Sequence, residues 1–232
     1  MNTVALQDFQ SYAKVNDNVI NKFKNKIPET LLKIWQNYGL GTSMNGYIKV
    51  INPDDYQSII DNTYFPYKDA VPIFVTAFGD IITLESGEYI SIMYLRYGKC
   101  ELMLKDFDFF LKRLADKSFL NEFFSLNQYY KAVNEHGNLL YIECFGYMPL
   151  LALGGDEDTD NLKKFQIPEH IALAKFQCPT NTPPNHNLPQ LLIKNRQNTR
   201  KKAVPNLRNC LFIKSSINVL GFCFFEFLQA VG

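Results

Sequence analysis

The chain has 232 residues, of which 47% are hydrophobic and 20% are charged, the proportions of an ordinary globular protein. This composition excludes a wholly disordered chain and a fibrous repeat. The formal net charge of +1 conceals an asymmetry, because residues 1–177 carry 17 basic and 22 acidic side chains whereas residues 178–232 carry 7 and 1. The 5 cysteines are widely spaced, which fits neither a disulfide framework nor a paired-cysteine zinc site.

The two ends of the chain bear on its location. The first residues lack the basic and apolar regions of a secretory signal. The most apolar stretch, residues 210–232, is interrupted by polar side chains and does not resemble a membrane span. We therefore expect a cytoplasmic protein without membrane contact.

Two helices are predicted at the start of the chain. A weak helical pattern covers about residues 5–24. A stronger one follows, with apolar side chains at the helical period, Pro28 at the first helical position and Gly39 just past the end. Its apolar face holds Trp35, the only tryptophan, which we assign to the core.

Short β-branched and aromatic runs come next, separated by turn signals at Gly79-Asp80 and Ser86-Gly87. They predict an antiparallel sheet with strands at residues 46–51, 71–78, 81–84 and 89–94.

Helical patterns return from Asp106 towards residues 119–124, from near Asn127 to Gly137, and over residues 168–176. Residues 139–153 between them are read as two short strands or as a strand plus a loop. The predicted fold class is α+β. An antiparallel sheet with flanking helices occupies residues 1–115, and a smaller, mainly helical α+β domain occupies residues 116–177.

The tail, residues 178–232, is first basic and then apolar. Its first part is rich in proline and asparagine, a composition that builds no core, and its last part shows no regular apolar period. We expect it to be poorly ordered. Whether it is a functional extension or one read out of frame relative to related chains stays open.

Catalytic templates are absent from the sequence, so we predict no catalytic residues, no cofactor and no metal site. The phosphate-binding loop, the nucleophile elbow and the zinc-protease helix motif have no match. A pairing of Cys144 with His136 is conceivable, but a structural histidine at a helix end is the simpler reading. An uncharacterised enzyme, which needs a pocket of convergent polar groups, stays a third option.

The most polar cluster follows Gly154-Gly155. Its spacing resembles the start of a calcium-binding loop, yet Asn161 and Ile167 stand where that loop needs Gly and Glu. A solvated acidic loop is one reading, and a negative patch that attracts a basic partner is the other. The carboxylates of the cluster are Asp156, Glu157, Asp158 and Asp160, and Asp54-Asp55 form a smaller acidic spot.

The basic residues of the tail support an alternative function of a different class. Lysine and arginine side chains neutralise phosphates without reading base sequence, so a nucleic-acid-associated or regulatory binding module is the runner-up. Solvated basic tails are common, and we consider nucleic acid an unlikely partner. The residues concerned are Lys194, Arg196, Arg200, Lys201, Lys202 and Arg208.

Two segments resemble a known family. The run from Val71 to Asp80, Val-Pro-Ile-Phe-Val-Thr-Ala-Phe-Gly-Asp, resembles the strand and turn signature of GAD-like domains. Residues 137–155, with Glu-Cys-Phe-Gly-Tyr and Pro-Leu-Leu-Ala-Leu-Gly-Gly, are similar to the small domain that follows it in immunity proteins of type VI secretion DNase effectors. The likeness covers about residues 5–177 and leaves out the tail.

The resemblance implies a non-enzymatic antitoxin that binds the nuclease domain of a cognate secreted effector and prevents DNA cleavage in the producing cell or its kin. It supplies no map of the interface. From charge alone, the expected toxin-binding residues are Asp156, Glu157, Asp158 and Asp160, with Glu143, Asp54 and Asp55 behind them. We assign Phe78, Gly79, Asp80, Gly154 and Gly155 to folding. The identity of the toxin, the oligomeric state and the mode of inhibition stay open.

Overall fold

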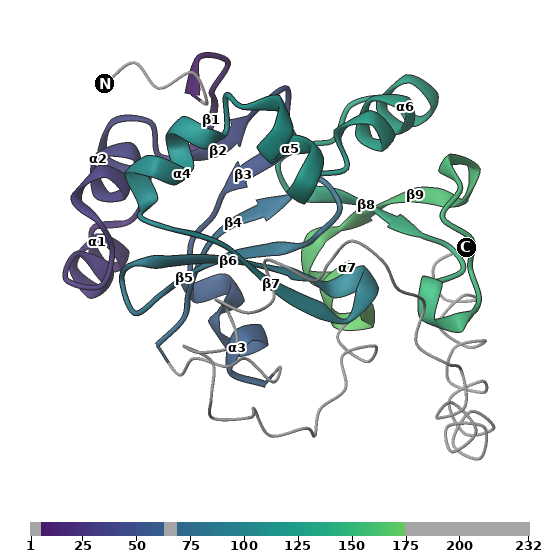
Figure 1. Ribbon diagram of the computed structural model, residues 1–232. Coiled ribbons are helices and arrows are strands. Elements are labelled where there is room, and N and C mark those ends of the chain that lie inside the picture. The colour runs from purple at the N-terminus through teal and green to yellow at the C-terminus, as the bar shows by residue number, and fades with distance from the viewer. Residues whose placement is uncertain (1–5, 63–68, 175–232) are drawn as a thin grey trace, which may run out of the picture. The chain divides into compact units, whose positions relative to one another are not determined.

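The computed structural model describes residues 6–62 and 69–174, which fall within one compact unit. In these ranges the chain forms a seven-stranded antiparallel sheet in which each strand pairs with the next one along the chain (Figure 1). The strands are β1 (Gln10–Ala13), β2 (Leu40–Ser43), β3 (Ile48–Val50), β4 (Val71–Thr76), β5 (Ile81–Glu85), β6 (Tyr89–Tyr94) and β7 (Lys99–Lys105).

Helices cover both faces of this sheet (Figure 1). On one face lie α1 (Asp17–Phe23), α2 (Glu29–Asn37), α4 (Phe107–Arg113) and α5 (Lys117–Phe123). On the other face lie α3 (Asp54–Asn62), which connects β3 to β4, and α7 (Ile167–Ala174).

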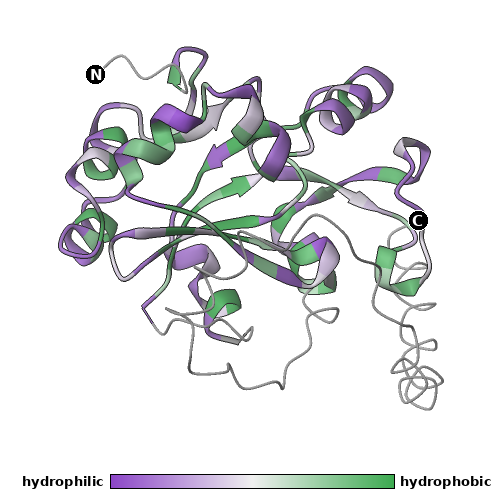
Figure 2. Cartoon of the chain, viewed as in Figure 1, coloured by the Kyte–Doolittle hydropathy of each residue, from purple (hydrophilic) through white to green (hydrophobic). Residues whose placement is uncertain are grey.

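The alternation of side chains along the strands separates two hydrophobic cores. Ile82 and Leu84 of β5 belong to the larger core under α2 and α4, whereas Ile81 belongs to the smaller core under α3 and α7. Trp35 lies in the larger core and is 2% exposed. The central strands are accordingly mainly apolar in Figure 2.

A second, two-stranded sheet pairs β8 (Glu143–Tyr147) with β9 (Leu162–Gln166). The connection between them contains the short 3₁₀ helices η3 (Leu151–Leu153) and η4 (Thr159–Asn161). The backbone N–H of Phe145 donates to the carbonyl of Ala77 at 2.7 Å, which fastens β8 to the end of β4. α6 (Leu126–His136) is fastened to the β2–β3 turn, because the Tyr129 hydroxyl donates to the Asn45 carbonyl at 2.7 Å.

The predicted α+β class and antiparallel sheet are confirmed, and residues 139–153 form a strand plus a loop. The single helix predicted over residues 5–24 is wrong, because residues 10–13 form an edge strand and only residues 17–23 are helical. The helical pattern after Asp106 divides at Asp116, whose side chain accepts from Ser118 N at 2.8 Å and caps a new helix.

The predictions for the tail, residues 178–232, lie outside the described residues. Within the described part of the chain, every helix is too short or too polar to cross a membrane.

Candidate protein-binding surfaces

The four carboxylates of the cluster after Gly155 are exposed on the loop between η3 and β9. Local hydrogen bonds fix this loop. Asp158 accepts from the backbone N–H of Asp160 at 3.3 Å and caps η4, and Asn161 donates to the carbonyl of Asp156 at 3.2 Å. The structure therefore holds the predicted acidic cluster as a defined loop that keeps its charges in solvent.

Exposed apolar side chains accompany this loop. Tyr97 lies in the 3₁₀ helix η2 (Leu95–Tyr97) that follows β6, is 41% exposed, and donates its hydroxyl to the carboxylate of Glu157. Leu153 of η3, which contacts η2, is 65% exposed. We call Tyr97, Leu153 and the four carboxylates at 156, 157, 158 and 160 the acidic-loop surface.

Asp54 and Asp55 lie elsewhere, in the first turn of α3, and both are exposed. Asp54 forms an ion pair with Lys22, which offsets its charge. Asp55 accepts a hydrogen bond from the Asn52 amide at 3.1 Å and keeps a net negative charge. The helix α3 is well separated from the loop between β8 and β9 in Figure 1, so the predicted residues do not form one patch.

A second surface surrounds Tyr12 and Tyr141, two residues that sequence reasoning missed. It includes the predicted residues Asp55 and Glu143. Tyr12 of β1 is 59% exposed and stacks on Tyr141, with ring centroids 4.2 Å apart. The Tyr141 hydroxyl donates to the carbonyl of Val50 at 3.0 Å. Burial, followed by the neighbouring Tyr56 and Asp55, raises the pKa of Tyr141. Asp55 lies in the first turn of α3, five residues after Val50, and so close along the chain to the carbonyl that Tyr141 contacts.

Leu140 and Ile142, on either side of Tyr141, are 63% and 40% exposed. Glu143 closes the turn, since its carboxylate accepts from the backbone N–H of Leu140 at 2.9 Å. We call Tyr12, Leu140, Tyr141, Ile142, Asp55 and Glu143 the Tyr12 surface. An apolar run such as 139–142 is typical of a buried strand, and the sequence contains no signal that its side chains are exposed.

A buried ion pair lies at the junction of the two sheets. Asp80 and Arg96 are 3.3 Å apart and almost fully buried, and the Arg96 guanidinium lies over the ring of Phe78 at 4.3 Å. Burial raises the pKa of Asp80 to about 6, although Arg96 favours its ionised form. The assignment of Phe78, Gly79 and Asp80 to folding stays a prediction, and these contacts supply a physical reason for it.

His170 of α7 is enclosed beside this pair. A Cβ atom at Gly146 would lie 2.4 Å from its ring, and one at Gly79 would lie 2.8 Å from it. Among the described residues neither ring nitrogen has a hydrogen-bond partner. Burial, with a smaller effect of Arg96, lowers the pKa of His170 to about 4, so the ring is neutral at physiological pH.

The two residues of the conceivable Cys–His pair have separate environments. Burial raises the pKa of the Cys144 thiol, the opposite of the change that activates a nucleophilic cysteine. His136 ends α6 and its Nε2 lies 3.2 Å from the carbonyl of Thr159. Over residues 6–62 and 69–174, no group of three His, Cys, Asp or Glu side chains is placed to hold a metal ion.

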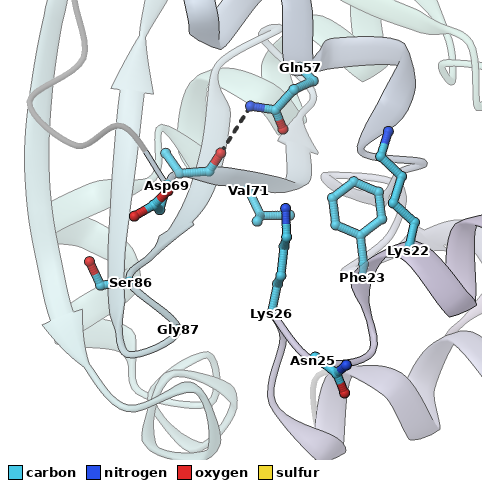
Figure 3. Close-up of a pocket in the computed structure, with 10 residues that line it drawn as sticks. Lys22, Phe23, Asn25, Lys26, Gln57, Asp69, Val71, Ser86 and Gly87 are labelled. Carbon is cyan, nitrogen blue, oxygen red and sulfur yellow. Dashed lines mark hydrogen bonds between the residues drawn. The ribbon is translucent and has the colours of Figure 1, made fainter.

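A pocket of about 370 Å³ opens between the C-terminal end of α1, α3, the start of β4 and the turn between β5 and β6 (Figure 3). Lys22 and Lys26 line it, and Gln57 donates to the carbonyl of Ala70 at 3.1 Å. The pocket lining carries charges of both signs, because Asp69 also lines it and Lys22 is paired with Asp54.

Two family models match consecutive parts of the chain. The GAD-like domain model matches residues 3–96, and the model of the C-terminal domain of the T6SS immunity protein Tdi1 matches residues 104–175. No curated protein matches the sequence significantly. The crystal structure of Atu4351 from Agrobacterium tumefaciens is similar with a TM-score of 0.64 and 19% identity, over 75% of this chain and 88% of that one. This likeness shows a shared fold.

The two matches follow each other in the order that the resemblance implies. Between them only residues 97–103, which include most of β7, are unmatched. The chain therefore has the two-domain architecture that the resemblance implies, a segment that matches the GAD-like domain followed by a segment that matches the C-terminal domain of the T6SS immunity protein Tdi1.

Proposed function

We propose that this protein is a cytoplasmic antitoxin that binds the nuclease domain of a cognate DNase effector and blocks DNA cleavage during competition between bacteria. The observation that carries the proposal is the match of residues 104–175 to the C-terminal domain of an immunity protein. The protein acts by binding, and we assign it no catalytic step of its own.

The charges of the described surfaces support a basic partner. A nuclease surface that binds DNA must be positive to neutralise phosphates, and exposed carboxylates complement such a surface. Complementary charge mainly accelerates association and adds specificity. We propose Asp156, Glu157, Asp158 and Asp160 as contacts of the toxin, together with Glu143, Asp54 and Asp55.

The direct test is plasmid cleavage by the nuclease domain of the effector encoded beside this gene. An equimolar amount of the full chain is expected to protect the plasmid and to form a complex on a sizing column. Unchanged cleavage without complex formation would refute the antitoxin function for that effector.

The acidic-loop contacts are tested by reversing four charges. Lysine at positions 156, 157, 158 and 160 is expected to slow association with the nuclease domain at least tenfold at low salt, because it inverts the local potential. The measurement is the association rate at several salt concentrations.

The matched control reverses four exposed carboxylates that lie outside both surfaces, and therefore makes the same change in net charge. Its effect should be several times smaller. Equal effects of the two variants would show that net charge alone matters and that the loop makes no specific contact. The control positions are Asp17, Asp61, Asp108 and Glu122.

A further inference from the structure

We propose that the Tyr12 surface is the site where the toxin domain is held, and that it receives apolar side chains surrounded by lysine or arginine. This inference rests on the proposed function and adds a location to it. The acidic-loop surface then attracts the partner, whereas the Tyr12 surface supplies most of the lifetime of the complex.

The Tyr12 surface gathers exposed apolar side chains in a small area. Leu140 to Glu143 form one β-turn, because the N–H of Glu143 donates to the carbonyl of Leu140 at 3.0 Å, and the ends of such a turn lie within about 7 Å. Tyr12 stacks directly on Tyr141 of this turn. Tyrosine and neighbouring apolar groups are the usual anchors of protein interfaces.

The turn is rigid before any partner arrives. The buried Lys49 donates from Nζ to the carbonyl of Leu140 at 3.1 Å, and the N–H of Ile167 donates to the carbonyl of Ile142 at 2.9 Å. With the Tyr141 and Glu143 hydrogen bonds, the backbone and the central ring are fixed. Binding therefore loses little conformational entropy, which favours a high affinity from a small contact.

Charge determines the kind of partner. Glu143 belongs to the turn itself, Asp55 lies five residues after Val50, whose carbonyl accepts from the Tyr141 hydroxyl, and Asp54 is already offset by Lys22. Two lysines lie near this turn and both donate to backbone carbonyls: the fully buried Lys49 to Leu140 at 3.1 Å, and the exposed Lys164 of β9 to Asn138 at 2.7 Å. A cationic surface fits this border, whereas a second copy of the same carboxylate-bordered surface would bring like charges together.

The acidic-loop surface is less suited to retain a partner. Its aromatic residue, Tyr97, already uses its hydroxyl for Glu157, and Leu153 is the only large apolar side chain beside it that is more than half exposed among the described residues. Most of its exposed groups are carboxylates, which act at long range.

The test measures the affinity of the full-length protein for the toxin domain of the effector encoded beside this gene. Leu140→Asp and Tyr12→Ala are each expected to weaken binding at least tenfold, mainly through faster dissociation. The control is Phe109→Asp, which changes another half-exposed side chain on α4 and should alter affinity less than twofold. Thermal melting verifies that each variant is folded.

A charge variant tests the border independently. Asp55→Lys is expected to reduce affinity at least threefold at low salt, and its matched control Asp108→Lys on α4 should not. This pair keeps the proposal testable if Tyr12→Ala fails to fold.

The outcomes separate the two proposals. Full affinity of folded Leu140→Asp and Asp55→Lys, while the unaltered protein still protects DNA, would overturn the Tyr12 surface and leave the antitoxin function standing. Failure of the unaltered protein to bind the toxin domain would refute the function itself. A dimer that Leu140→Asp converts to a monomer without loss of toxin affinity would show a self-association surface and overturn the inference.

Discussion

At the scale of single residues, Glu85 is the clearest source of pH-dependent stability. Its side chain lies at the end of β5, is 1% exposed, and has one oxygen without a partner among the described residues. Burial raises its pKa to about 7 despite hydrogen bonds from Ser91 and Thr83. The folded state thus keeps the proton between the unfolded pKa, about 4.5, and about 7. Its contribution to stability is present below pH 4.5 and is lost as the pH rises to 7.

Glu85→Gln should therefore stabilise the protein above pH 7 by roughly 2–3 kcal/mol, because the amide has the same shape without a charge to desolvate. Below pH 4.5 it should change little. Urea unfolding at pH 4.5 and pH 8 measures the difference. Glu88→Gln, at an exposed position paired with Lys105, is the control and should show no such gain. An equal effect at both pH values would contradict the assigned protonation.

At the scale of elements, the close approach of α7 to β8 depends on Gly146. A methyl group there would lie 2.5 Å from His170 Nδ1 and 3.0 Å from the ring of Phe165. Gly146→Ala should destabilise the fold by roughly 1–3 kcal/mol through overpacking. The double variant with His170→Ala should cost less than the two single changes added together, because the smaller side chain frees the space. If the two changes in unfolding free energy, measured by chemical denaturation, were strictly additive, contact with His170 would not be what limits the approach of α7 to β8.

The strands that were predicted are buried and rich in β-branched residues, whereas β2, which is also largely buried, contains only Thr42 of this type and was missed. β4, β5 and β6 are almost wholly buried, and their β-branched residues identify them. β1 and β7 are mostly exposed and β9 is partly exposed, with polar side chains such as Lys163 and Lys164, and these strands have no comparable signal. The strands that were not predicted are stabilised by pairing with their neighbours in the sheet rather than by their own composition.

Of the two candidate surfaces, one was predictable from the sequence and the other was not. The carboxylates of the loop at 156–160 were visible in the sequence because a charged cluster stays exposed in most folds. The Tyr12 surface was not, since it depends on a stack between residues from distant parts of the chain. Only tertiary structure decides whether an apolar run such as Leu139 to Ile142 is buried or exposed.

At the scale of the whole molecule, the larger core joins both family segments. It contains Ile48 and Phe78 from the first segment, and Phe110, Tyr129 and Phe145 from the second. Each segment thus buries apolar surface against the other, and separation would expose these rings to water. We expect the described residues to unfold in one cooperative step.

A fragment ending at Lys105 tests this expectation. It retains the seven strands but lacks α4 and α5, which cover one face of the sheet. It should show no cooperative thermal transition and should aggregate, whereas the full chain should melt in a single transition that calorimetry detects. A fragment that melts cooperatively by itself would show that the first segment is an independent folding unit.

The stack of Tyr12 on Tyr141 has a consequence for the newly made protein. These rings come from distant parts of the chain, and the turn that presents Leu140 is fixed by hydrogen bonds from Lys49 and Ile167. The Tyr12 surface is thus assembled only after synthesis has passed α7. A nascent chain that has not yet reached α7, or a fragment that ends before Ile167, displays no such surface.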